Sequence, residues 1–251
     1  MPDAAHLKTP KTMKPIRFVP SLCCALLAAV SLGAFAAPPQ KLTLQYDVSR
    51  NGTVMVEIVE RLEHEGKSYS LTSDAKGKGI YAMVRSGTVK RSSKGTVIAT
   101  GLRPEEFHDK RGDRPERTAR FDWGKVTVLH GEGGKLETKP IASPERVSDR
   151  LAMYWTFAFR PLPGKDASVS LAVADGGQFD DFRFVSAGTE SVKTGAGDIE
   201  ALKLVKVPDP GDERGTVIWL GIKHGYVPVR ILVVEKDGTR IDQVVTSIST
   251  Q

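Results

Sequence analysis

Short runs of alternating apolar and polar residues recur along most of this chain and constrain its fold more than any other feature. Leu42, Leu44 and Tyr46 alternate with polar neighbours, and an Asn-Gly pair follows at residues 51–52. A period of two is typical of a strand with one buried face, and Asn-Gly is a strong hairpin signal. Turn signals recur about every 8–12 residues, which predicts an antiparallel meander of about thirteen strands in a single domain.

A sheet with that many strands must curl, close or split into layers. We therefore expect a mainly β fold, built as a strongly curved antiparallel sheet or an open barrel, with two packed sheets as the alternative. The expected strands include residues 80–84, 96–100, 217–220, 227–234 and 240–248. Residues 103–120 combine charges of both signs with proline and glycine, so we expect a solvated, mobile loop there.

The stretch SDRLAMYWTFAF, at residues 148–159, departs from the strand pattern. Its apolar residues have the helical spacing i, i+3, i+4, i+7 and i+8, at Leu151, Tyr154, Trp155, Ala158 and Phe159. This spacing predicts one amphipathic helix over about residues 148–160, packed on or in the sheet. Met153 and Phe157 lie off the main stripe, so the helix is apolar on more than one face and suits a segment enclosed on two sides.

Both ends of this predicted helix carry signals. Ser148 is a favourable N-cap, Asp149 is favourable in the first turn, and Pro161 stops the helix. An alternative start has Ser143 as the cap and Pro144 in the first position. The sequence therefore allows two starting points for the helix: one at Ser148, and an earlier one at Ser143.

The N-terminus has the parts of a secretory signal peptide, residues 1–36. A basic start precedes residues 19–35, which carry no charge, and AFA at residues 34–36 supplies a small-x-small cleavage signal. We expect cleavage near Ala36 and Ala37, which leaves residues 37–251 as one exported, periplasmic β-rich domain. Met13 is an alternative translation start that gives the pre-sequence an ordinary length.

Removal of this segment changes the composition. Cys23 and Cys24 both lie within it, and no small residue precedes Cys23 as a lipid-anchor motif requires. The mature chain therefore has no thiol for a disulfide or a metal. The segment also holds four of the 36 basic and one of the 30 acidic residues, which leaves a net charge of +3. That small charge does not support nucleic-acid binding, and we expect no transmembrane segment in the mature chain.

Motifs for catalysis are absent: the sequence has neither a serine elbow nor a zinc-binding HExxH pattern. Four histidines remain after signal removal, at spacings that match no compact metal site: His64, His108, His130 and His224. We therefore expect no catalytic residue, no metal and no cofactor. The enzyme alternative is a hydrolase of an envelope polymer, for which Glu105, Glu106, His108 and Asp149 are the acid–base candidates.

Four stretches occur together in a familiar order: LTLQYDVSRNG, FDWGKVTV, SDRLAMYWTFAF and VIWLGIKHGYVPVRI. In this combination the chain resembles the DUF3108 family of exported bacterial proteins, over about residues 41–248. The resemblance supplies no catalytic residue to carry over. It implies an architecture similar to the curved sheets wrapped on a helix in periplasmic lipid and lipoprotein carriers.

Three functions compete on these observations. The first is a non-enzymatic periplasmic binding module for a lipid-like ligand or an envelope partner, with ligand contacts from Tyr154, Trp155, Phe159 and Trp219. The second is a structural or assembly protein of the cell envelope that pairs an exposed edge with a partner strand. The third is the hydrolase. For the aromatic residues, packing in the core is the competing interpretation.

Overall fold

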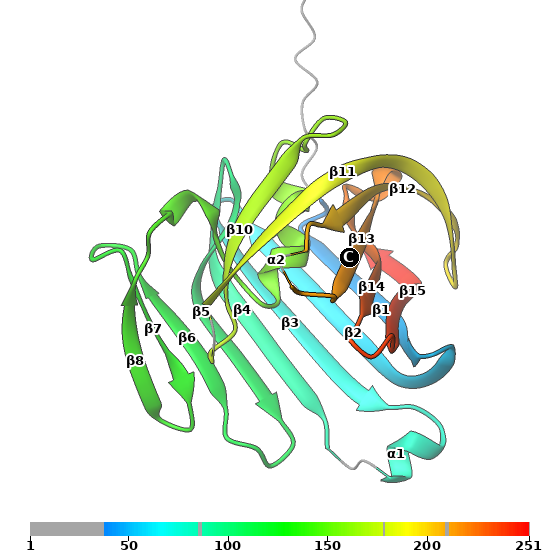
Figure 1. The fold of residues 1–251 in the computed structure, drawn as a ribbon, viewed down its shortest axis with the longest axis horizontal. Helices are drawn as coiled ribbons and strands as arrows, with labels where there is room; N and C mark the ends of the chain where they lie inside the picture. Colours follow the sequence, from blue (N-terminus) through cyan, green and yellow to red (C-terminus); the bar gives the residue numbers. More distant parts are fainter. Residues whose placement is uncertain (1–37, 85–86, 178, 209–210, 251) are drawn as a thin grey trace, which may run out of the picture. The chain divides into compact units, whose positions relative to one another are not determined.

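A computed structural model of the protein describes residues 38–84, 87–177, 179–208 and 211–250, all within the compact unit Phe35–Gln251 (Figure 1). The predicted signal peptide lies outside the described residues and stays a prediction. Among the described residues, no helix combines the length and the apolar composition that a membrane crossing requires.

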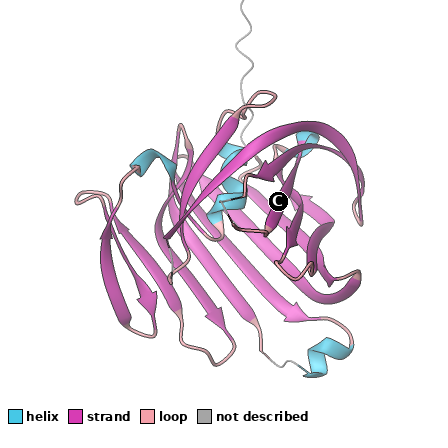
Figure 2. Cartoon of the chain, viewed as in Figure 1, coloured by secondary structure: helices cyan, strands magenta, loops and turns pink. Residues whose placement is uncertain are grey.

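The described strands form one sheet of 15 strands. In chain order they are β1 Lys41–Arg50, β2 Thr53–Glu65, β3 Ser68–Gly77, β4 Val89–Ile98, β5 Gly101–Arg111, β6 Arg117–Asp122, β7 Thr127–Glu132, β8 Lys135–Pro140, β9 Val147–Asp149, β10 Ser168–Ala174, β11 Phe179–Thr194, β12 Gly197–Lys206, β13 Gly215–Gly221, β14 Val227–Val234 and β15 Arg240–Thr250. The helical elements are α1 Ile80–Val84, α2 Ala152–Trp155 and the 3-10 turns η1 Pro144–Arg146, η2 Thr156–Phe159 and η3 Ile222–His224 (Figure 2).

The strands of this sheet follow the chain closely. The order is β8-β7-β6-β5-β4-β3-β2-β1-β15-β14-β13-β12-β11-β10-β9, so the first and last strands pair in the middle. Neighbouring strands are antiparallel except for β9, which runs parallel to β10. The edge strands β8 and β9 are not paired with each other, and Figure 1 shows β11 and β12 arching over the middle of the sheet. The expected strongly curved, open antiparallel sheet is confirmed.

The segment of residues 147–160 joins the two halves of the sheet from inside the curve. On one side, β9 pairs with β10. On the other, the Leu102 N–H donates to Thr156 Oγ1 at 2.9 Å, and Ser93 donates to the Asp149 carboxylate. Gly101 lies so close to Thr156 that a Cβ at this glycine would overlap the threonine hydroxyl. The curl of the sheet is therefore held by contacts to this segment rather than by pairing of the edge strands β8 and β9 with each other.

Two apolar clusters fill the interior on either side of this segment. Trp155 and Leu151 belong to the larger cluster, which has members on β1, β2, β3 and β5 and also on β6, β7 and β10 to β15. Met153 and Phe157 belong to the cluster formed with β10 to β14, where the Phe157 ring meets Phe184 edge-on at 6.0 Å. Met153 and Phe157, which lie off the helical stripe in the sequence, therefore face the second cluster. The segment is enclosed by apolar residues on two sides, as its sequence predicts.

The helical part of this segment is shorter than expected. Instead of a helix over residues 148–160, residues 147–149 form β9, and the helix begins at Ala152 and changes to a 3-10 turn at Thr156. Asp149 rather than Ser148 caps it, because its Oδ1 accepts the N–H groups of Leu151 and Ala152 at 2.8 Å. Residues 148 and 149, which the sequence placed in the first turn of the helix, adopt an extended conformation because they pair with β10.

The alternative start is realised as a separate element. Pro144–Arg146 forms the 3-10 turn η1, which is preceded by Ser143 (φ −139°, ψ 80°) and followed by Val147 in an extended conformation. Ser143 makes no side-chain cap hydrogen bond to the backbone of the turn. The cap signals at residues 143–146 therefore mark a turn that precedes β9 rather than the first turn of a longer helix.

Two other sequence predictions were wrong. Residues 80–84 form α1 rather than a strand, because Gly79 (φ +60°) turns the chain back and Gly77 leaves room for the backbone of Tyr81. Residues 103–120 are not a solvated loop but most of β5 and β6. Their charges alternate with the buried Phe107 and are matched by neighbouring strands, which mixed composition alone does not reveal.

Candidate ligand-binding cleft

A row of directly opposed polar residues crosses the concave face of the sheet below Trp155. Cross-strand register pairs Glu60 with Ser73, Ser73 with Arg91, Arg91 with Asp109, and Asp109 with Arg117. Residues opposite each other in a sheet lie on the same face. The row begins at Glu60, which accepts a hydrogen bond from Trp155, and ends at Arg117, which lines the polar cleft described below.

Asp109 is the most tightly held member of this row. Its side chain is 1% exposed, and the Arg111 guanidinium bonds both carboxylate oxygens, at 2.6–3.1 Å. Arg91 Nε lies 3.2 Å from Oδ2. Burial by itself would raise the pKa of Asp109, but the hydrogen bonds and charges of Arg111 and Arg91 outweigh burial and lower it. Asp109 is therefore an anion that fixes two arginines.

Two other buried acids behave in the opposite way. Burial raises the pKa of Asp149 to about 6, against the hydrogen bonds from Ala152, Ser93 and Leu151 that lower it. Burial also raises the pKa of Glu60, although the Trp155 Nε1–H donates to Glu60 Oε2 at 2.7 Å. Neither acid has a cation bonded to it at ion-pair distance among the described residues, which is why desolvation dominates.

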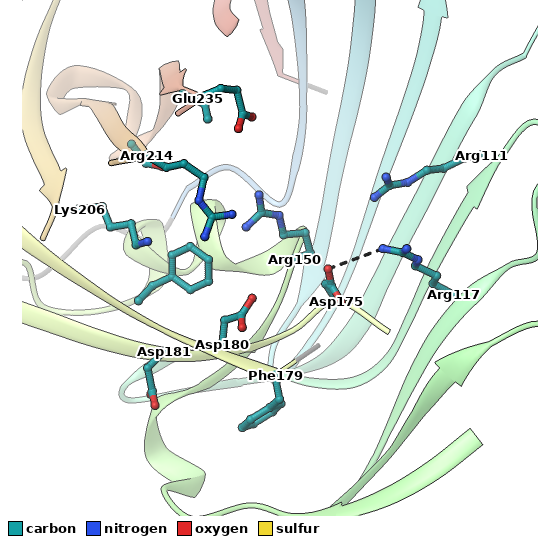
Figure 3. A pocket seen from close by; sticks show the side chains of 13 residues that line it. Arg111, Arg117, Arg150, Asp175, Phe179, Asp180, Asp181, Lys206, Arg214 and Glu235 are labelled. Carbon is teal, nitrogen blue, oxygen red and sulfur yellow. Dashed lines mark ion pairs between the residues drawn. The ribbon is translucent and has the colours of Figure 1, made fainter. Parts of the chain in front are cut away.

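The polar cleft lies where β5 and β6 face β11 to β14 across the interior (Figure 3). Its volume is about 510 Å³. The lining residues are Arg111, Arg117, Arg150, Asp175, Phe179, Asp180, Asp181, Phe182, Lys206, Arg214, Thr216, Val233 and Glu235. Five cations and four carboxylates therefore share one opening, and the Arg117–Asp175 ion pair at 3.9 Å spans it.

The apolar trough continues the same face of the sheet at the ends of β1, β2 and β15. Its volume is about 430 Å³. The lining residues are Val48, Ser49, Arg50, Met55, Val56, Glu235, Asp237, Thr239 and Ile241. The register of β1 against β2 shifts at this point, which leaves Met55 as an extra residue beside Val56. A β-bulge of this kind re-aims a side chain, and here both side chains line the trough.

The trough shares lining residues with a hollow on each side. Glu235 lines both the trough and the polar cleft, and Val233 of the cleft is the cross-strand partner of Ile241 of the trough. Met55 and Val56 also line a side pocket of about 130 Å³ beneath α1. The open end of the concave face is thus one amphipathic surface, polar towards β5 and β11 and apolar towards β1 and β2.

The residues predicted to contact a ligand lie elsewhere. Trp155 is fully buried, Phe159 is 8% exposed and stacks edge-on against His64 at 5.1 Å, and Tyr154 is half-buried between the two apolar clusters. Trp219 is 5% exposed and donates to Glu190 Oε1 at 2.6 Å. None of these four lines the polar cleft or the trough, so their predicted ligand contacts stay a prediction.

The hydrolase candidates do not converge. Glu106 and His108 lie on the face of β5 opposite to Phe107 and Asp109, with His108 Nε2 at 3.7 Å from Glu106 Oε2. Asp149 is fully buried on the inner side. Among the described residues no three His, Cys, Asp or Glu side chains form a group that could hold a metal ion. The side chains expected to act together in acid–base chemistry are therefore separated by the sheet.

The sequence reasoning missed the cations of the polar cleft. Arg111 and Arg117 fell within the predicted loop, and Arg214 lies between two strands. Arg150 did carry a signal, because it is the only charged residue in the run from Arg150 to Phe159. A single arginine at the start of so apolar a segment marks the point where that segment reaches the solvent-accessible part of the interior.

Comparisons with known proteins agree with this architecture. Residues 43–245 match the family described as "Protein of unknown function (DUF3108)". A β-barrel-like protein of the domain of unknown function DUF1849 from Brucella abortus has a similar fold, with a TM-score of 0.53 at 8% identity, over 86% of this chain and 100% of that one. No curated protein matches the sequence significantly.

Two further solved structures align over 86% of this chain. One is described as a "putative lipoprotein" from Parabacteroides distasonis, with a TM-score of 0.38, 11% identity and 98% of that chain covered. The other is a "putative exported protein" with a YmcC-like fold from Bacteroides fragilis, with a TM-score of 0.36, 12% identity and 100% covered. The match over residues 43–245 covers most of the sequence, and the chain therefore belongs to the DUF3108 family.

Proposed function

We propose that the protein is an exported, non-catalytic binding module that holds a lipid-like ligand at the open end of its concave face. The observation that carries this proposal is the apolar trough of about 430 Å³, which is in the size range of small-molecule sites. Each buried methylene contributes about 0.8 kcal/mol, so about six methylenes in the trough would contribute about 5 kcal/mol. That is enough to offset much of the cost of association.

The surroundings of the trough support a ligand with a chain. Val48, Val56 and Ile241 are half-buried aliphatic residues on one face of three neighbouring strands. The side pocket beneath α1 extends the apolar surface towards Ala75 and Val89. An exported protein with such a surface has access to the lipids and lipopeptides of the envelope, which supports the periplasmic location that the N-terminal sequence predicts.

The competing functions have less support. An assembly role through strand addition needs an open edge, but the exposed edge strand β8 carries Lys135, Lys139 and Pro140. Lysine and proline on an edge strand are features that prevent pairing with another chain. The hydrolase needs converging carboxylates or histidines, and its candidates lie on opposite faces of the sheet.

A matched pair of substitutions on β2 tests the proposal. Val56→Glu places a carboxylate in the trough, whereas Val54→Glu places it at a position on the same strand that is 41% exposed and outside the trough. Burying a charge against an alkyl chain is costly. We expect dodecanoate to bind the wild-type protein and the Val54→Glu control equally and to bind Val56→Glu at least ten-fold more weakly, by isothermal titration.

Equal affinity of the two variants, or no binding of dodecanoate to the wild-type protein, would contradict the proposal. Native mass spectrometry of the full-length protein, expressed with its own N-terminus and recovered from the periplasm, gives an independent result. We expect a mass increment that corresponds to a bound amphiphile and that is lost in Val56→Glu.

A further inference from the structure

Among the residues that the structure describes, Arg150 has no carboxylate partner, which distinguishes it from the other cations of the polar cleft. Arg111 is bonded to Asp109 at 2.6 Å, Arg214 to Asp212 at 2.8 Å, and Arg117 to Glu132 at 3.2 Å. Within the described part of the chain, the Arg150 guanidinium contacts the Met153 sulfur at 3.9 Å and lies over the Phe182 ring at 5.6 Å. It therefore brings an unneutralised positive charge into the cleft.

Phe182 supports a second cation beside Arg150. Lys206 Nζ lies 5.0 Å from the centre of the same ring, and its side chain is only 8% exposed. An aromatic face attracts cations and orients them without neutralising their charge. Asp212 lies 3.6 Å from Lys206, so the excess charge of this pair resides on Arg150.

Among the described residues, no carboxylate of the cleft forms an ion pair with Arg150. Asp181 neighbours Phe182 in the strand and so points to the other face of β11, and Figure 3 shows its carboxylate directed away from Arg150. The pKa of Arg214 is raised chiefly by its hydrogen bond to Asp212, with smaller contributions from the charges of Glu235 and Asp180. In Figure 3 the guanidinium groups of Arg150 and Arg214 both project into the middle of the cleft.

We propose that Arg150, on the Phe182 platform and beside Lys206, binds the anionic head group of the ligand, a carboxylate or a phosphate. This inference rests on the proposed function, because it places the chain of the same ligand in the apolar trough. Glu235 lines both spaces, so the cleft and the trough adjoin at this residue, and the proposal places the head beside Arg150 and leads the tail past Glu235 into the trough. The ligand class is then a single-headed anionic amphiphile rather than a neutral lipid.

Three ligands with the same twelve-carbon tail test this assignment: dodecanoate, dodecyl phosphate and the neutral 1-monolauroylglycerol. The variant is Arg150→Met, which keeps an unbranched side chain and removes the charge. The control is Arg146→Met, which makes the same change at an arginine on η1 outside the cleft, with its side chain 42% exposed. Thermal unfolding of both variants checks that the fold is retained.

We expect the wild-type protein to bind the two anionic ligands about ten-fold more tightly than the neutral one. Arg150→Met should remove this preference by weakening the anionic ligands about ten-fold while leaving 1-monolauroylglycerol unchanged, and Arg146→Met should change none of the three. If Arg150→Met retains the preference, or weakens all three ligands equally, the head-group assignment is overturned while the trough proposal stands.

Titration with inorganic phosphate alone tests whether the anion bound at Arg150 is the head group of an amphiphile or a free anion. Phosphate that binds as tightly as dodecyl phosphate, and does so only with Arg150 present, would overturn the assignment to an amphiphile head group in favour of a free anion. Val56→Glu keeps the two proposals distinguishable, because it should weaken all three amphiphiles, the neutral one included, whereas Arg150→Met should weaken only the anionic ones.

Discussion

The two ends of the curved interior are built from the same strands but packed differently. At the closed end, around residues 147–160, Trp155, Phe157 and Met153 are fully buried, and an inserted segment occupies the space between the two halves of the sheet. At the open end, the polar cleft and the apolar trough are lined by half-buried side chains and by charges. Alternation along strands thus produces a closed core only where another segment fills the concavity.

The difference between the ends predicts a difference in energetic sensitivity. Trp155→Ala removes a fully buried ring and leaves Glu60 without its indole donor, so we expect a loss of about 3–5 kcal/mol in the free energy of unfolding. Ile241→Ala, in the trough, should cost about 1 kcal/mol, because its side chain is only half-buried. Urea unfolding followed by circular dichroism measures both values.

Equal losses for these two variants would show that the open end is packed as tightly as the closed end. If Trp155→Ala does not fold, Trp155→Phe replaces it in the comparison. That variant keeps most of the ring and removes the hydrogen bond to Glu60, so its loss should still exceed that of Ile241→Ala.

Asp109, in the polar row that borders the open end, should be the more costly of two buried aspartates to neutralise. Asp109→Asn leaves Arg91 and Arg111 without an anion, and we expect a loss of about 3 kcal/mol at pH 7. Because the pKa of Asp109 is lowered in the folded protein, its stabilising contribution is present above the unfolded pKa of about 4 and is lost as the pH falls. The difference between wild type and variant should therefore shrink below pH 4 in urea titrations.

Asp149, at the closed end, should show the opposite pH dependence. Its folded pKa of about 6 exceeds the unfolded value, so between about pH 4 and 6 the native state binds the extra proton and the free energy of unfolding falls as the pH rises. Asparagine resembles the protonated acid and does not titrate. Relative to wild type, Asp149→Asn should gain up to about 3 kcal/mol from pH 4 to pH 7.

The readout for Asp149 is the difference between the two proteins at each pH, because the raised pKa of Glu60 contributes a slope of the same sign to both. Parallel curves for wild type and Asp149→Asn across this range would mean that Asp149 is already ionised in the folded protein near pH 4. As the pH rises, Asp109→Asn should therefore lose stability relative to wild type, whereas Asp149→Asn should gain stability relative to wild type.

A smaller effect than that of Trp155→Ala is expected at Gly101, where the β4–β5 turn packs against the segment of residues 147–160. Gly101→Ala and Gly52→Ala both place a Cβ at positive φ, +121° and +86°, but only the first meets Thr156, while the second meets nothing within 4 Å. Overpacking costs about 1–3 kcal/mol, so Gly101→Ala should be less stable than Gly52→Ala by about that amount. Equal melting temperatures would show that the Gly101 turn can move away from the segment.

Much of the fold was accessible from local patterns, and the exceptions share a cause. The alternation at Leu42 and Leu44 and the spacing of Leu151 and Trp155 report which face of each element is buried, since burial on one face is a local property. The loop predicted for residues 103–120 failed because its charges are matched by partners on other strands, as for Asp109 and Arg91. A segment of mixed charge is interpreted as a solvated loop when the partners of its charged residues on other strands are not known.

The candidate site was less accessible than the fold. The aromatic residues chosen from the sequence, Trp155 above all, are the most apolar part of the chain, and apolar residues are what a core requires first. The trough instead uses aliphatic residues such as Val56 and Ile241, which are indistinguishable in sequence from other strand residues. Of the polar cleft, only Arg150 had a recognisable local signal, as an isolated charge in an apolar run.

By itself the sequence determined that the protein is a curved, mainly antiparallel sheet with one inserted helical segment, because strand periodicity, turn residues and helical spacing act over a few neighbouring positions. Only the tertiary structure decided which end of the concavity that segment fills. It also decided that Arg111 and Arg117 are paired with carboxylates while Arg150 has no such partner among the described residues. Pairing of charges and the filling of space depend on residues far apart in the chain, so they emerge only when the strands are placed side by side.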